Sequence, residues 1–175
     1  STTPDSPASW SSPNIVVSDI DIRPSQGDAL SIVLGQENLH ILYQEIRDDV
    51  TGIDRVGLMY THGDSQLSAW GFQSSVGDNA RNAEIAVLGN GSDDVLVAAW
   101  IEGRGKEAKI AHIVTDNGWS DDAELLSSPG ITFVELNPTS DGIQILYDEI
   151  NTKGPVTRYG LLSDSENGNT LSLSN

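Results

Sequence analysis

The chain has 175 residues, with 9 Lys and Arg against 26 Asp and Glu and a formal net charge of −17. A hydrophobic share of 37% is typical of a folded domain, and the negative charge disfavours nucleic acid and anionic membrane surfaces as partners. No segment approaches the roughly 20 apolar residues that span a bilayer, and the absence of Cys excludes disulfides, thiolate zinc sites and Cys nucleophiles.

Short apolar runs separated by Gly, Asn, Asp and Ser predict an all-β fold, because no window keeps the apolar spacing of a helix. We expect one domain over 1–175, with an orphan strand at 9–18 and repeats at about 28–76, 82–128 and 130–175. The strands expected in these repeats are 29–35, 39–46, 54–61 and 67–75, then 83–89, 95–102, 108–115 and 118–128, and finally 130–138, 143–150, 156–163 and 169–175.

The second strand of each repeat carries the clearest internal similarity. The segment LHILYQEI (39–46) returns as VLVAAWIE (95–102) and IQILYDEI (143–150), at spacings of 56 and 48 residues. Four-stranded units of about this length are typical of β-propeller blades. A nearly continuous apolar run indicates a strand that is covered on both faces.

The number of repeats is the difficulty for this interpretation, because propellers have about four to eight blades. We therefore expect about three blades per chain, completed by a second chain or copy, or a segment of a larger propeller. The orphan strand 9–18 favours such interlocking. A β-trefoil, which closes three four-stranded repeats within one chain, is the alternative fold.

Alignment of the repeats brings together an aromatic residue, a glutamate and a cation. Residues two apart in a strand share a face, so each second strand places its aromatic beside its glutamate, and each third strand is expected to begin with an equivalent cation. The aligned residues are Tyr43, Glu45 and Arg55; Trp100, Glu102 and Lys109; and Tyr147, Glu149 and Arg158.

Two interpretations of this set remain open. The glutamate and cation can form a cross-strand ion pair that stabilises the hairpin, worth about 0.2–1 kcal/mol. Alternatively, they can bind sugar hydroxyls while the aromatic stacks on the sugar ring. Trp70 and Trp119 open the expected fourth strands and either line an inter-blade groove or pack between blades; Trp10 has the same two readings.

The turn Gly118-Trp119-Ser120-Asp121, combined with the Arg/Glu/aromatic strand pair, resembles the fungal fucose-specific lectins. The wider class of sialidase-like propellers is also similar. The lectin resemblance implies a six-bladed propeller of repeats of about 50 residues that binds glycans between its blades. In that family the Arg lies on the second strand of the blade and the Glu on the third, whereas this chain has the reverse order.

Features of catalysis are sparse. His40, His62 and His112 fall at unrelated places in the repeats, and the chain has no metal-ligand His spacing, nucleophile elbow or phosphate-binding glycine loop. A pair of carboxylates from different blades, as in glycoside hydrolysis, stays an alternative. The sequence therefore favours a non-enzymatic function.

Acidic loops at 47–54, 115–122 and 163–170 offer oxygen ligands for Ca²⁺, but none keeps the order of the twelve-residue calcium loop. We expect no cofactor, with Ca²⁺ as the alternative. The first residue, Ser1, and the sequon Asn90-Gly91-Ser92 are compatible with secretion.

The sequence thus predicts a secreted, non-enzymatic carbohydrate-binding protein whose partners are glycans and a second chain or copy. The alternatives are a structural or protein-interaction propeller, and a fragment of a glycan-active hydrolase or lyase.

Overall fold

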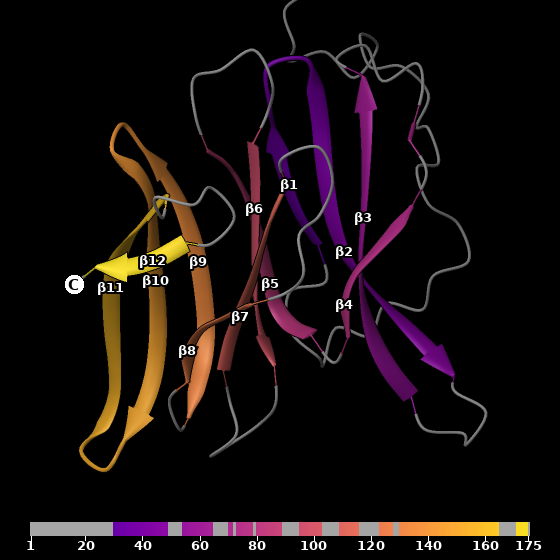
Figure 1. Ribbon diagram of the computed structural model, residues 1–175. Helices are drawn as coiled ribbons and strands as arrows, with labels where there is room; N and C mark the ends of the chain where they lie inside the picture. The colour runs from indigo at the N-terminus through magenta and orange to yellow at the C-terminus, as the bar shows by residue number, and fades with distance from the viewer. Residues whose placement is uncertain are drawn as a thin grey trace, which may run out of the picture.

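The structure is a computed structural model, shown in Figure 1. It describes residues 30–48, 54–64, 70–71, 73–78, 80–88, 95–102, 109–115, 123–127, 130–164 and 171–174. These residues form strands and turns and contain no helix, which confirms the all-β prediction. The expected orphan strand 9–18 and Trp10 lie outside the described residues.

The described strands form three four-stranded antiparallel sheets, in each of which strands consecutive in the chain are neighbours. Sheet 1 contains β1 (Leu30–Leu34), β2 (Asn38–Asp48), β3 (Asp54–Asp64) and β4 (Ser74–Asp78). Sheet 2 contains β5 (Ala80–Leu88), β6 (Val95–Glu102), β7 (Lys109–Thr115) and β8 (Ala123–Ser127). Sheet 3 contains β9 (Ile131–Thr139), β10 (Gly142–Asn151), β11 (Gly154–Asp164) and β12 (Leu171–Ser174).

No described strand pairs with a strand of another sheet, and none of the three sheets closes on itself. A β-trefoil requires strands of different repeats to pair into one barrel, so the trefoil alternative does not fit. Sheet 2 lies between sheets 1 and 3, with the first strands β1, β5 and β9 adjacent in that order (Figure 1).

The two spaces between the sheets hold most of the apolar core. We call the side of a sheet that points toward higher-numbered sheets its forward face, and the other its backward face. In β6, Leu96, Ala98 and Trp100 point backward into a cluster with sheet 1, whereas Val97 and Ala99 point forward into a cluster with sheet 3. The continuous apolar run of β6 thus results from burial on both faces.

Polar contacts between first strands connect neighbouring sheets. The Ser31 hydroxyl donates to Glu84 Oε2 at 2.9 Å and accepts from the backbone N–H of Ile85 at 3.2 Å. Between sheets 2 and 3, Asn82 Oδ1 accepts from the backbone N–H of Val134 at 2.8 Å. Asn82 has a φ of 50° and lies in a register irregularity of β5, so this bulge aims the side chain at the next sheet.

Sheet 3 has a different burial pattern from sheet 2. Along β10 the backward-pointing Ile143, Ile145 and Tyr147 are buried, while Gln144 and Leu146 on the forward face are partly exposed. This alternation is typical of an antiparallel sheet that is covered on one face. Among the described residues, the forward face of sheet 3 therefore has no sheet packed on it.

Candidate ligand-binding site

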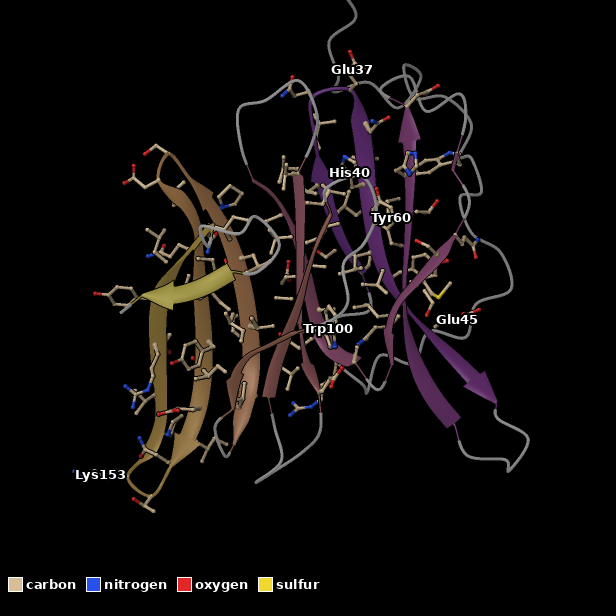
Figure 2. The ribbon with its side chains drawn as sticks, in the orientation of Figure 1. Glu37, His40, Glu45, Tyr60, Trp100 and Lys153 are labelled. Atoms are coloured by element: carbon tan, nitrogen blue, oxygen red, sulfur yellow. The ribbon has the colours of Figure 1, made fainter. Side chains whose placement is uncertain are left out.

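The repeated aromatic and glutamate share the backward face in all three sheets, as the period of two predicts. In sheet 2 the pair is in direct contact, because the indole Nε1 of Trp100 donates to Glu102 Oε1 at 3.1 Å. Figure 2 shows Trp100 between sheets 2 and 1 and Glu45 in the lower half of sheet 1.

The three aromatic rings belong to the core. Tyr43 is 2% exposed, Trp100 0% and Tyr147 4%. Sugar stacking requires an accessible ring face, and these rings already pack against apolar neighbours. The structure therefore assigns them to packing within and between sheets.

Trp70 lies four residues before β4 and forms an isolated bridge with Gly63, so the expected fourth strand 67–75 starts later than predicted. A Cβ added at Gly63 would come within 3.0 Å of the Trp70 ring, which shows how closely the indole covers this glycine. The ring also packs against Ile41, Tyr43 and Met59. Trp70 is thus a packing residue, and Trp119 lies outside the described residues.

The prediction that the three cations occupy equivalent positions is wrong. Arg55 stands opposite Arg47, two residues beyond the partner of Glu45. Lys109 stands directly opposite Glu102. Arg158 stands opposite Tyr147 instead of Glu149.

For Arg55 the cause is the length of its hairpin. The other two hairpins have equal register, seven residues from Glu102 to Lys109 and from Glu149 to Val156, and Arg158 simply lies two residues further along its strand. The β2–β3 ladder ends at the pair Asp48 and Asp54, whereas the β10–β11 ladder ends at Asn151 and Gly154 with two residues between them. Counted from the repeated glutamate to the residue opposite it, the first hairpin spans 12 residues (Glu45 to Gly57) and the third spans 7 (Glu149 to Val156), so third-strand positions in sheet 1 are shifted by five. The structure describes only the backbone at Arg55 and Lys109, so their register is known but the positions of their side chains are not.

The one fully described member of the predicted set is a charge pair on the backward face of sheet 3. Arg158 Nε donates to Glu149 Oε1 at 2.7 Å. The Glu149 side chain is 11% exposed and that of Arg158 51%. A nearly buried carboxylate therefore holds a half-exposed guanidinium on the side of sheet 3 that faces sheet 2.

The electrostatics of this pair follow from that geometry. The hydrogen bond from Arg158 to Glu149, together with the carboxylate charge, raises the pKa of the guanidinium. Burial raises the pKa of Tyr147; the charge of Arg158 opposes this shift and that of Glu149 adds to it. The site at neutral pH thus holds a neutral phenol, a carboxylate and a permanently charged guanidinium.

A second cluster, which the sequence pattern did not predict, lies on the forward face of sheet 1. His40 Nδ1 lies 2.8 Å from Tyr60 Oη, and His62 stands opposite His40, with its ring 5.9 Å from that of Tyr60. Figure 2 labels His40 and Tyr60 in the upper half of sheet 1. The signal available in the sequence was the equal distance of the two histidines from the β2–β3 hairpin. His40 is buried and hydrogen-bonded, as in a packed core.

No metal-binding group of three or more His, Cys, Asp or Glu side chains occurs within the described strands and turns. Most residues of the acidic loops proposed for Ca²⁺ lie outside those segments. In the part of the chain that the structure describes, no helix is long and apolar enough to cross a membrane.

Comparison with known proteins adds no assignment. A scan against protein-family models finds no match, and a search of curated proteins finds none either.

Proposed function

We propose that the protein is a secreted, non-enzymatic carbohydrate-binding protein. The observation that carries this proposal is the Glu149–Arg158 pair on the face of sheet 3 that points toward sheet 2. Its hydrogen bond uses Nε of Arg158, which leaves the two terminal NH₂ groups of a half-exposed side chain to donate to a ligand.

The chemistry of the pair suits a neutral sugar. The planar guanidinium presents parallel N–H donors that match two neighbouring hydroxyls, and Glu149 restrains the guanidinium before any ligand arrives. Because Tyr147 is buried, the ligand would be bound by polar contacts and not by stacking on this ring. A single such site is expected to bind weakly, so avidity would require several copies.

A glycan array with labelled protein tests the proposal, with Arg158→Lys and Arg158→Ala as variants. We expect binding to at least one neutral glycan that both variants lose, because Lys keeps the charge but not the planar donors. Lys153→Ala is a matched control, since it removes an exposed cation at the β10–β11 turn (Figure 2). Absence of binding to every neutral glycan would refute the function. If the Arg158 variants lower thermal stability but leave glycan binding intact, the pair only stabilises its hairpin.

We further propose that the three sheets are blades of a β-propeller that a second chain or copy completes. Three units are fewer than the four to eight of a closed propeller. The forward face of sheet 3, on which no described sheet packs, supports this arrangement. The alternative is that this face is a protein-interaction surface.

A further inference from the structure

Large exposed hydrophobic side chains gather at the two ends of the sheet array. Among the described residues they are Leu30 (53% exposed), Ile32 (52%), Leu34 (68%), Ile150 (56%) and Tyr159 (70%). The first three, which we call the β1 stripe, share the backward face of sheet 1 with Tyr43. The last two lie on the forward face of sheet 3. No exposed member of this set lies between two sheets.

The β1 stripe has buried counterparts in the other two sheets. Ile32 holds the register position of Ile85 in β5 and of Leu136 in β9. Ile85 is 4% exposed and Leu136 is 7% exposed, and each belongs to the cluster shared with the preceding sheet. The β1 stripe is therefore shaped to pack on a forward face, and no described sheet presents one to it.

The forward face of sheet 3 shows the complementary pattern, because positions that are buried or partly buried in sheet 1 are more exposed here. Leu146 holds the register position of Leu42, which is 1% exposed in the cluster between sheets 1 and 2. Tyr159 holds the position of Tyr60, which packs against that same cluster. In sheet 1 these positions are covered by β5, whereas Leu146 and Tyr159 are covered by no described strand. This face is shaped to receive a first strand.

We propose that the β1 stripe of a second copy of this chain packs on the forward face of sheet 3, head to tail. The proposal rests on the propeller arrangement proposed above and names its partner and its surfaces. Two copies contribute six sheets, within the range of closed propellers. Two such contacts, related by a two-fold axis, close the ring and bury both apolar ends.

Polar groups favour this contact over one between two copies of sheet 3. Glu135 and Asp148 both lie on the forward face of sheet 3, so pairing that face with itself would bring carboxylates together. The β1 stripe carries no charge. Glu135 also holds the register position of Ser31, whose hydroxyl accepts from the backbone N–H of Ile85. The backbone N–H of Ile32 in the second copy is the equivalent donor.

Light scattering and sedimentation at micromolar concentrations test the contact. We expect the full chain to have twice the 18.7 kDa mass of one copy. Ile32→Glu and Tyr159→Glu should each give a monomer, because each places a charge in the contact. Thr152→Glu is the matched control, since it adds the same charge at an exposed turn, and it should stay dimeric. Circular dichroism should show native β structure in all three.

Further outcomes separate this contact from others. An equimolar mixture of Ile32→Glu and Tyr159→Glu should regain a dimer, because one wild-type stripe still meets one wild-type face. A cysteine pair, Ile32→Cys with Leu146→Cys, should crosslink two copies, since the chain has no other Cys. A monomeric wild type would overturn the proposal, as would a wild-type dimer that Ile32→Glu leaves intact or isolation with a different protein on this face. Glycan binding that survives in the monomeric variants would show that the binding function does not depend on this contact.

Discussion

Close packing between Gly77 of β4 and Trp100 of the neighbouring sheet leads to a quantitative prediction. A Cβ at position 77 would lie 2.9 Å from Cζ2 and 3.0 Å from Cε2 of the indole, whereas non-bonded carbons prefer about 3.5–4.0 Å. Trp100 is 0% exposed and cannot move aside without disturbing the cluster between sheets 1 and 2. We expect Gly77→Ala to lower the free energy of unfolding by about 1–3 kcal/mol.

A second substitution tests whether the indole is the cause. Trp100→Phe removes Cζ2 and Nε1, and with them the hydrogen bond to Glu102. Lost volume and the lost bond should cost about 1–3 kcal/mol. In the Trp100→Phe background the methyl of Gly77→Ala enters vacated space. The double variant should therefore lose less unfolding free energy, by about 0.5–3 kcal/mol, than the two single losses added together.

Urea denaturation followed by far-ultraviolet circular dichroism measures these differences, because a tryptophan signal would change with the substitution itself. Ser75→Ala, at an exposed position of the same strand, is the control and should change stability by less than about 0.5 kcal/mol. If Gly77→Ala costs the same with Phe at position 100 as with Trp, the steric explanation is refuted.

Two further predictions concern sheet 3 and its contact with β5. Asn82→Ala should lower the free energy of unfolding by about 1–3 kcal/mol in urea denaturation, because the N–H of Val134 loses its acceptor. Asn82→Gly should cost less, because glycine tolerates the φ of 50° at this position. Equal costs for the two variants would show that backbone strain makes no contribution. The pKa of Tyr147 is raised in the folded chain, mainly by burial. The stability that the protonated Tyr147 phenol contributes is therefore fully present below the ordinary tyrosine pKa of about 10. This stability is lost as the pH rises through the raised pKa of the folded chain. Tyr147→Phe should reduce the fall in stability measured by urea denaturation above that pH, and an unchanged pH dependence would contradict this assignment.

The strand pattern was predictable because it depends on local spacing. Apolar residues recur at every second position at 143, 145 and 147, and along β10 (Gly142–Asn151) these three are buried while Gln144 and Leu146 between them are partly exposed. The shared face of Trp100 and Glu102 also follows from the period of two along one strand. Such features need no knowledge of which strand lies alongside.

The candidate site was less predictable because it depends on pairing across a hairpin. Arg55 and Arg158 both open apolar third strands, yet they stand opposite Arg47 and Tyr147. The register of a hairpin follows from its loop length and turn geometry, and the first hairpin is longer by five residues. Aligning the sequences at the starts of the strands does not reveal which residues stand opposite each other across a hairpin.

The sequence by itself determined the all-β class, the threefold repeat of four strands and the aromatic–glutamate pairs, because each depends on side-chain alternation within a strand. Tertiary structure alone decided that Tyr43, Trp100 and Tyr147 are buried and that Arg158 meets Glu149. It also decided that Ile32 and Tyr159 remain exposed at the two ends of the array. These outcomes depend on which sheet lies against which face, and burial is a property of neighbours that are distant in the chain.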